Sequence, residues 1–305
     1  MGMGLILQAN GAMAAEKLTV LLDWFVNPDH GPLVVAKQKG FFAEAGLDVE
    51  LVAPADPTQP PKLVAAGKAP LAVSYQPELH LQVDAGLPLV RVATLVNTPL
   101  ATLIALRDGP VKAVADLKGK TVGYSLPFYE ELLLPTMLKA HGLEPGDVKT
   151  VAVNFALSQA LMTGKVDATI GAFRNFELNQ MDIEKHPGHA LHPEDNGVPA
   201  YDELILVTNP EALEKAPLRP FLAALEKATR YIIDHPEESW RDFIAAHPDL
   251  NDDLNRRAWR DTIPHLAPRP AALDADRYDR FGAFLKGRGL VKATPPVATY
   301  AVELR

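Results

Sequence analysis

Short apolar runs alternate along the chain with segments whose apolar residues recur at helical spacing. The first run, residues 17–24, ends in the polar turn Asn27–Gly31. A helix is predicted from Pro32 to Gly40, because proline suits the first turn of a helix and glycine the residue after its end. The next predicted elements are a strand over 47–52, a helix over 62–66 and a strand over 71–75. This alternation predicts βαβ units around mainly parallel sheets.

The same order of elements begins again near residue 118. A strand over 118–124 enters a turn at Ser125–Pro127. The elements predicted after it are a helix over 128–140, a strand over 148–153, a helix over 158–164 and a strand over 166–173. The chain is therefore predicted to have two α/β halves with a similar order of strands and helices.

An internal similarity supports two lobes. Residues 63–68 (LVAAGK) precede one apolar strand, and residues 160–165 (ALMTGK) precede another, 97 residues further on. This distance is too long for a solenoid repeat and fits two lobes of similar construction. The alternative is that a helix followed by glycine, lysine and a strand is simply a common α/β junction.

The pattern changes after Pro210, where helical periodicity replaces the alternation. Apolar residues mark one face of each of four helices: Phe221, Leu225, Ala228 and Ile232; Trp240, Phe243 and Ile244; Leu254 and Ala258; Tyr278, Phe281 and Leu285. The outer faces are charged and carry no cluster of reactive groups. We expect this tail to serve packing alone.

Composition narrows the class of protein. The 305 residues are 48% hydrophobic and 22% charged, as in a globular protein of about two domains. A formal net charge of −8 argues against a nucleic-acid partner. The chain has no cysteine, which excludes disulfides, thiolate metal sites and the lipid-carrying cysteine of a lipoprotein.

The first fifteen residues combine a short apolar run with small residues at Ala12–Ala14. These features are typical of a secretory signal, although the first basic residue is Lys17. We interpret residues 1–15 as a clipped or misannotated signal remnant; a natural disordered N-terminus is the alternative. No stretch is long and apolar enough for a spanning helix.

Four predicted strands end in polar and aromatic loops. Ligands bind beyond the carboxyl ends of parallel strands, where such loops meet. The loops are residues 23–30, 74–78, 124–130 and 173–177, two from each half of the chain. They carry rings (Trp24, Tyr75, Phe128, Tyr129, Phe176), carboxylates (Asp23, Glu78, Glu130, Glu177) and a single permanent cation, Arg174.

This inventory favours a flat heteroaromatic ligand with N–H donors. Rings stack on its faces, and a carboxylate accepts paired hydrogen bonds from a ring N–H and an exocyclic amine. A phosphate, sulfonate or nitrate site would need several cationic or backbone donors, and no glycine-rich phosphate loop is present. The alternative is that about half of these rings belong to the core and half of the acids are solvated.

The same loops resemble a known family. LLDWFVNPDHGPLVVAKQKGFFAEAGLDVEL is similar to the opening of the thiamine-pyrimidine binding proteins of bacterial ABC importers, and SYQPEL, DLKGKTVGYS, GKVDATIGAFRNFE and GVPAYDELILVTN continue the similarity in order. The resemblance implies a type II periplasmic-binding-protein fold, with two α/β lobes joined by two crossovers. The first lobe is then 16–106 with 205–305, and the second is 107–204. The crossovers are expected near Leu106–Gly109 and Tyr201–Leu206.

The resemblance also implies a function. It implies a monomeric periplasmic protein without a lipid anchor, which closes its lobes on a formylated aminomethyl-pyrimidine or a close relative and delivers it to an inner-membrane permease. No catalysis, cofactor or metal is expected. Another heteroaromatic ligand, such as a flavin, is an alternative. The candidate ligand-binding residues are Asp23, Trp24, Asn27, His30, Ser74, Tyr75, Ser125, Phe128, Glu130, Asn175, Glu177 and Tyr201; among them Glu177 is the expected carboxylate partner of the aminopyrimidine edge.

An enzyme of the same superfamily, the eukaryotic thiamine pyrimidine synthase, is a further alternative. The resemblance places its pyridoxal-phosphate lysine at Ser74 and its sacrificial histidine at Glu78. A Schiff base needs a primary amine, which serine lacks, and the synthase's cysteine-rich run has no counterpart here. Separately, His186, His189 and His192 have a spacing that a metal site could use, but the stretch is typical of a surface loop.

Overall fold

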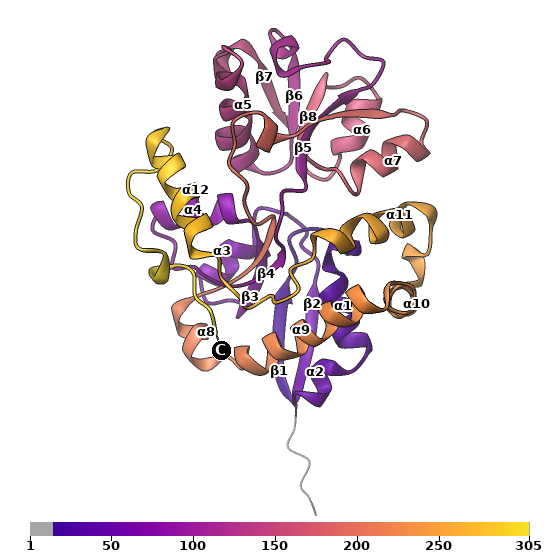
Figure 1. The fold of residues 1–305 in the computed structure, drawn as a ribbon, viewed down its shortest axis with the longest axis vertical. Helices are drawn as coiled ribbons and strands as arrows, with labels where there is room; N and C mark the ends of the chain where they lie inside the picture. The colour runs from indigo at the N-terminus through magenta and orange to yellow at the C-terminus, as the bar shows by residue number, and fades with distance from the viewer. Residues whose placement is uncertain (1–14, 305) are drawn as a thin grey trace, which may run out of the picture.

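Two five-stranded sheets form the centres of two lobes, one above the other in Figure 1. The structure is a computed structural model, and it describes residues 15–304. The first sheet has the order β2 (Leu47–Val52), β1 (Glu16–Leu21), β3 (Leu71–Ser74), β10 (Leu204–Thr208) and β4 (Val90–Val96). The second has the order β7 (Lys149–Ala152), β6 (Thr121–Tyr124), β8 (Ala168–Phe173), β5 (Ala101–Leu106) and β9 (Gly188–Leu191).

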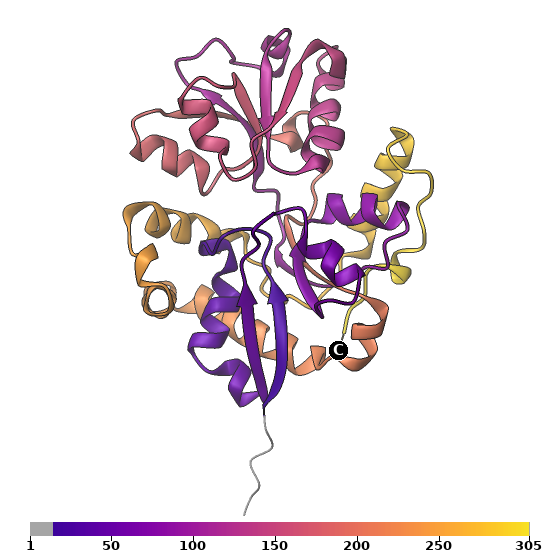
Figure 2. The ribbon, with the colours of Figure 1, turned by 180° about the vertical axis from the view of Figure 1, so that it is seen from behind.

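Helices cover both sheets, as Figures 1 and 2 show from opposite sides. In the first lobe they are α1 (Gly31–Gln38), α2 (Phe41–Glu44), α3 (Pro60–Ala65), α4 (Gln76–Asp84), α8 (Pro210–Lys215), α9 (Leu218–Asp234), α10 (Pro236–Ala246), α11 (Asp253–Thr262) and α12 (Ala275–Gly287). In the second they are α5 (Leu134–Ala140), α6 (Leu157–Met162) and α7 (Glu177–Ile183). Within residues 15–304, no helix has the length and apolar character to cross a membrane.

The predicted elements are present, with small shifts at their ends. Strand β2 has the predicted bounds, whereas β1 ends at Leu21 because the chain leaves the sheet there for the loop after it. The helix predicted over 128–140 starts one residue earlier and contains a π-helix over Tyr129–Leu133, followed by α5. The predicted signal remnant, residues 1–15, lies outside the described residues except for Ala15.

The two sheets have the same topology, which explains the internal similarity of the sequence. In each, three parallel strands are followed by a strand antiparallel to its neighbours, β10 in the first lobe and β5 in the second. Strands β3 and β8 hold the corresponding central position, and each follows a short helix and a glycine. The similar segments are therefore equivalent parts of two lobes.

The lobe boundary predicted after residue 106 needs correction by one strand. Residues 101–106 form β5, which pairs with β8 and β9 inside the second sheet. The first crossover is therefore residues 97–100, between β4 and β5, and the second is residues 192–203, between β9 and β10. The run of β5 is apolar on both faces, so its pattern fits a buried strand of either lobe, and only the pairing decides between them.

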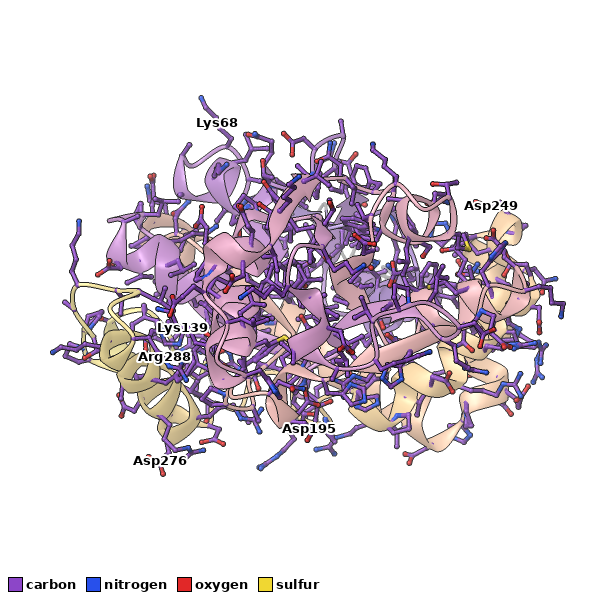
Figure 3. The ribbon with its side chains drawn as sticks, turned by 90° about the horizontal axis from the view of Figure 1, so that it is seen from above. Lys68, Lys139, Asp195, Asp249, Asp276 and Arg288 are labelled. Carbon is purple, nitrogen blue, oxygen red and sulfur yellow. The ribbon has the colours of Figure 1, made fainter. Side chains whose placement is uncertain are left out.

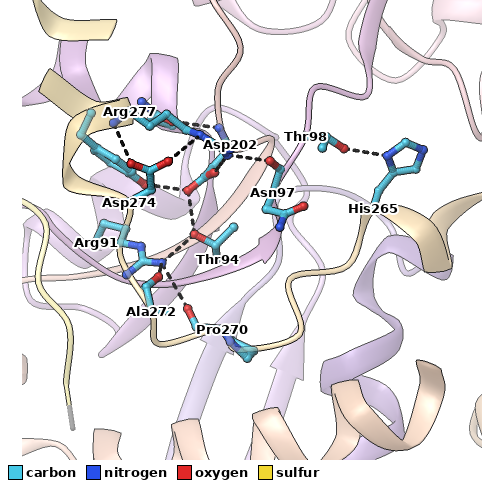
Figure 4. Close-up of polar contacts among 12 residues, drawn as sticks. Arg91, Thr94, Asn97, Thr98, Asp202, His265, Pro270, Ala272, Asp274 and Arg277 are labelled. Atoms are coloured by element: carbon cyan, nitrogen blue, oxygen red, sulfur yellow. Dashed lines mark hydrogen bonds and ion pairs between the residues drawn. The ribbon is translucent and has the colours of Figure 1, made fainter. Parts of the chain in front are cut away.

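Buried charged groups hold the crossovers together. Glu203 Oε2 accepts the N–H groups of Leu100 and Ala101, at 2.6 and 2.8 Å, and so joins the second crossover to the first. Arg277 of α12 donates to the Asn97 carbonyl oxygen at 2.6 Å and pairs with the Asp202 carboxylate (Figure 4). Figure 4 also shows Thr94 between Asp202 and the buried Arg91. The C-terminal helix α12 thus anchors both crossovers to the first lobe.

Candidate functional site

A cavity lies between the lobes, beyond the ends of β1, β3, β6 and β8. It encloses about 420 Å³ of space between atoms, including the part open to solvent. The lining residues are Asp23, Trp24, Asn27, Asp29, His30, Tyr75, Ser125, Tyr129, Leu157, Gly171, Phe173, Phe176, Glu177 and Leu204. Seven of the twelve candidate residues are among them. All four predicted loops therefore meet at one place, as the rule for parallel strands requires.

Asp23 is the centre of a hydrogen-bonded group in the first lobe. Its Oδ1 lies 2.9 Å from His30 Nε2, and its Oδ2 accepts from the Tyr75 hydroxyl at 2.5 Å. His30 Nδ1 accepts the N–H of Asn27, at 3.3 Å, so the ring donates through Nε2. Burial and the neighbouring Asp23 raise the pKa of Tyr75 well above its usual value, so the phenol stays a donor.

The turn after β1 positions a second carboxylate, Asp29. Asn27 begins a short 3₁₀ turn over Pro28–His30, and its Oδ1 accepts the N–H of Asp29 at 2.8 Å. Burial raises the pKa of Asp29, against the opposing effect of its hydrogen bonds with Thr262 and Asn175. The polar turn of the sequence thus places an acid directly in the cavity wall.

Glu177 supplies a third carboxylate, from the opposite lobe. It begins α7, and its Oε2 accepts the N–H of Phe173, at 2.6 Å, across the turn after β8. Burial raises the pKa of Glu177 to about 7, while that hydrogen bond acts to lower it. The side chain is 8% exposed. A carboxylate has more acceptor positions than this one bond uses, so it can bind ligand donors as well.

Aromatic rings from both lobes close the cavity. The Trp24 ring lies edge-on to Phe155, with centroids 4.3 Å apart, and Phe25 contacts both Phe155 and Phe176. On the inner side, Tyr75 packs against Tyr129 with centroids 6.2 Å apart. Each of these pairs joins a first-lobe ring to a second-lobe ring, so the aromatic wall exists only while the lobes are together.

A glycine and a π-helix determine where Tyr129 lies. Gly171 has φ +94°, and a Cβ at this position would meet the Tyr129 ring at 2.4 Å. The π-helix over Tyr129–Leu133 turns this ring onto the glycine of β8. π-Helical turns are frequent at functional sites. Only glycine fits both the backbone angle and the close approach of the ring.

No lysine or arginine lines the cavity in the part of the chain that the structure describes. Arg174, the cation of the predicted loops, pairs with Glu194 through both terminal nitrogens, at 2.7 and 3.0 Å. Its other donors face the carbonyl oxygens of Leu100 and Ala101 in the first crossover. Three carboxylates therefore face the cavity without a matching fixed positive charge.

Five candidate residues do not line the cavity. Ser74 donates to Glu78, at 3.3 Å, and Phe128 packs behind Tyr75 with centroids 5.2 Å apart. Tyr201, which belongs to the second crossover, is fully buried against Phe281. Each supports the site from behind.

Glu130 and Asn175 are displaced for identifiable reasons. Glu130 follows Tyr129 on the π-helix, where consecutive side chains point in different directions around the axis, so Tyr129 faces the cavity and Glu130 turns away. Its carboxylate accepts from Thr150 on the edge strand β7, at 2.6 Å. Asn175 lies beside the cavity and donates to Asp29 across the gap between the lobes, at 2.6 Å.

The candidate set omitted seven lining residues: Asp29, Tyr129, Leu157, Gly171, Phe173, Phe176 and Leu204. Four of them lie in the loops that the sequence identified. The sequence therefore predicted where these residues lie, but not the direction of their side chains. Leu157, Gly171 and Leu204 carry no polar signal, and no pattern in the sequence distinguishes them from core.

Two of the three histidines of the predicted surface stretch have separate side-chain partners. His189 Nε2 contacts the Lys112 carbonyl oxygen at 2.9 Å, and His192 Nδ1 lies 3.5 Å from Thr102 Oγ1. Among residues 15–304, no three histidine, aspartate or glutamate side chains are grouped so that they could hold a metal ion.

The fold and the interlobe cavity define the class: a two-lobed binding-protein fold. Solved structures of similar shape include the alkanesulfonate-binding protein of Xanthomonas axonopodis bound to MOPS, with a TM-score of 0.74 and 17% identity over 94% of this chain and 99% of that one. Another is the periplasmic nitrate-binding protein of Synechocystis, with a TM-score of 0.68 and 16% identity over 95% and 86%. The periplasmic-binding-protein fold implied by the resemblance is confirmed.

The chain belongs to the family described as NMT1/THI5 like, whose model matches residues 27–239. It is 52% identical to a Haemophilus influenzae protein named for thiamine biosynthesis, over 99% of this chain and 96% of that protein. It is 37% identical to the formylaminopyrimidine-binding protein of Halalkalibacterium halodurans, over 78% and 73%. It is also 28% identical to a 4-amino-5-hydroxymethyl-2-methylpyrimidine phosphate synthase of Saccharomyces cerevisiae, over 81% and 76%. The family therefore holds proteins named as binders and as synthases.

Proposed function

We propose that this protein is the periplasmic solute-binding protein of an ABC importer and that it captures an unphosphorylated thiamine-precursor aminopyrimidine between its lobes. The observation that carries the proposal is the cavity itself, where Asp23, Asp29 and Glu177 stand among aromatic rings and, within residues 15–304, without a lysine or arginine. The protein would be soluble in the periplasm, without a lipid anchor, and would deliver its ligand to a permease of the inner membrane.

The chemistry of an aminopyrimidine suits this wall. Its ring nitrogens are acceptors, and its donors are the exocyclic amine and the N–H or O–H of the neighbouring substituent; a carboxylate such as Glu177 can accept from both of these donors. Its flat faces bury well between rings such as Trp24 and Tyr75.

Charge separates this ligand from anionic ones. Two of the proteins with a similar fold are named for binding alkanesulfonate and nitrate. An anion in this cavity would face three carboxylates and no fixed cation, which is unfavourable in a site of low dielectric. The same reasoning disfavours a phosphorylated pyrimidine.

The synthase function has little support from the residues in place. The names of several relatives raise it, but no lysine amine faces the cavity within the described residues, and Ser74 does not line the cavity and donates its hydroxyl to Glu78. Without such an amine the chain cannot form a Schiff base there. Capture without chemistry on the ligand is therefore the function that we propose.

Calorimetric titration tests the proposal with a matched pair of ligands. Purified protein is titrated with formylaminopyrimidine, with 4-amino-5-hydroxymethyl-2-methylpyrimidine and with the phosphate of the latter. We expect tight binding of at least one unphosphorylated pyrimidine and a loss of at least a hundredfold in affinity on phosphorylation. A flavin, an alkanesulfonate and nitrate complete the panel.

Three results would contradict the proposal. Preference for the phosphate would show that the cavity tolerates an anion. Tight binding of a flavin alone would assign another heteroaromatic to the same fold. Turnover of a pyrimidine precursor, followed by mass spectrometry, would identify an enzyme.

A further inference from the structure

Three buried polar residues meet between the lobes beside the cavity. Asn175, in the turn after β8, donates from Nδ2 to Asp29 Oδ1 at 2.6 Å and to Thr262 Oγ1 at 2.7 Å. Thr262 in turn donates to the same Asp29 oxygen at 2.8 Å. All three side chains are at most 2% exposed. We name Asp29, Asn175 and Thr262 the interlobe cluster.

The interlobe cluster continues onto the surface between two helices. Asn179 of α7 donates to Asp261 of α11 at 2.7 Å, and Arg257 of α11 pairs with Asp182 of α7 at 3.0 Å. Figures 1 and 2 both show α11 directly below α7 across the gap between the lobes. The helical tail therefore does more than pack, because its α11 supplies the first-lobe side of this contact.

Asp29 belongs to both the cavity and the interlobe cluster. Its carboxylate lines the cavity, and one of its oxygens receives both Asn175 and Thr262. A ligand donor that orients this carboxylate also orients the acceptor that Asn175 needs. When the lobes separate, Asn175 moves away with the second lobe, and Asp29 and Thr262 remain on the first.

We propose that the interlobe cluster couples ligand occupancy to lobe closure, with Asn175 and Thr262 as positioning residues that do not touch the ligand. Asp29 then contacts both the ligand and the other two residues of the interlobe cluster, and α11 is a functional element of the first lobe. Hydrogen bonds to a carboxylate in a buried site are stronger than neutral ones, so this small cluster can shift an equilibrium between open and closed lobes. The ligand-dependent half of the proposal rests on the proposed function; the interlobe half does not.

Because the chain has no cysteine, two introduced cysteines can be labelled specifically, and the distance between the lobes can be measured directly. Cysteines placed at Lys139 of the second lobe and Asp249 of the first, both exposed and labelled in Figure 3, accept a donor and an acceptor dye. Single-molecule energy transfer then gives the populations of open and closed lobes. The same molecules are measured with and without 4-amino-5-hydroxymethyl-2-methylpyrimidine.

The variants distinguish an effect of the interlobe cluster on lobe closure from an effect on the overall stability of the fold. Asn175→Ala removes the second-lobe donor, and Thr262→Val removes the first-lobe hydroxyl while it keeps the shape. Thr262→Ser restores the hydroxyl and should restore the wild-type populations. Lys227→Ala breaks a surface ion pair with Glu44 inside the first lobe and serves as the matched control. Asp261→Ala, at an exposed position, tests the surface contact without disturbing the core.

We expect Asn175→Ala and Thr262→Val to reduce the ratio of closed to open molecules by at least fivefold without ligand. With ligand, we expect dissociation about tenfold faster and association nearly unchanged, because the loss of a closing contact acts on the exit rate. Unchanged populations in both variants, with Thr262→Ser also unchanged, would overturn the inference. Failure of wild-type protein to bind any pyrimidine would overturn the proposed function but leave the ligand-free comparison decisive for the interlobe cluster.

Discussion

The ring of Trp24 in the first lobe meets the ring of Phe155 in the second edge to face, with centroids 4.3 Å apart and planes at 64°. Trp24 lines the cavity, whereas Phe155 lies outside it and is only half-buried. The pair joins the two lobes at the cavity wall, so we expect a bound ligand to leave only after the two rings separate.

Replacement of Phe155 by alanine should therefore speed ligand release. Aromatic pairs contribute about 0.5–1.5 kcal/mol beyond area burial, which corresponds to a dissociation rate about two- to tenfold higher. Stopped-flow displacement measures this rate. Phe284→Ala, which removes a half-buried ring from within the first lobe, is the control and should leave the rate unchanged. Equal rates for Phe155→Ala and wild type would show that the ring does not cover the exit.

Trp24→Ala should lower affinity and leave the fold intact. Loss of the apolar contact with the ligand weakens binding by about 1–3 kcal/mol. The indole borders the cavity, so the ligand-free melting temperature should fall only slightly. Calorimetry and thermal unfolding of the same preparation measure the two effects. A large fall in melting temperature with little change in affinity would identify Trp24 as a core residue.

Glu177→Gln should weaken binding of an aminopyrimidine at least tenfold. The substitution keeps the size but replaces one acceptor oxygen with an NH₂ group that opposes the ligand's donors, at a cost of about 1–3 kcal/mol. Calorimetric titration of both proteins at pH 8 tests this. Identical affinities would remove Glu177 from the site.

The same variant tests a pH dependence of binding. Burial raises the pKa of Glu177 to about 7, so the carboxylate takes up a proton as the pH falls through this value. Wild-type affinity for donor-bearing ligands should therefore decline below about pH 7. Glu177→Gln cannot protonate and serves as the reference for titration of the ligand itself. Parallel pH profiles for the two proteins would contradict the assignment.

Stability should change with pH in the opposite sense from that of a salt-bridged acid. The pKa of Glu177 is raised by folding from 4.5 to about 7, so its contribution to stability is complete below pH 4.5 and is lost as the pH rises through 7. The difference corresponds to about 3 kcal/mol. Because Glu78 and Glu203 are raised to about 7 as well, wild type alone does not isolate Glu177. Measured by urea unfolding, the free energy of unfolding of wild type should fall relative to that of Glu177→Gln by up to this amount between pH 4.5 and pH 8. A difference between the two proteins that does not change with pH would contradict this expectation.

Gly171→Ala should damage the site through Tyr129. The new Cβ would meet the Tyr129 ring at 2.4 Å, and the backbone at φ +94° is strained for alanine. Gly164→Ala provides the control, because it has φ +70° with no atom within 4 Å of its Cβ. We expect both variants to lose about 1 kcal/mol of stability from the backbone, and Gly171→Ala to lose about 1–3 kcal/mol more from the displaced ring, together with ligand affinity. Equal affinities in the two variants would show that the position of Tyr129 is unimportant for binding.

The sequence alone determined the two α/β lobes and the place of the site. Parallel strands point their carboxyl ends to one edge, so loops as distant as those of Asp23 and Glu177 were expected to meet. It also determined the character of the cavity, because rings and carboxylates stand in those loops with one cation. Periodicity and turn chemistry are local properties, and they are readable without a partner strand or helix.

Only the tertiary structure decided what depends on contacts between distant segments. The strand at residues 101–106 is buried on both faces, so its pattern is the same in either lobe, and hydrogen bonding with β8 and β9 assigns it to the second. A π-helix turned Tyr129 toward the cavity and Glu130 away from it. Thr262 looked like packing material in its own helix, and it became part of the interlobe cluster because α11 lies across the gap from α7. The physical reason is that side-chain direction and lobe membership are set by long-range pairing, which leaves no signature in the local pattern.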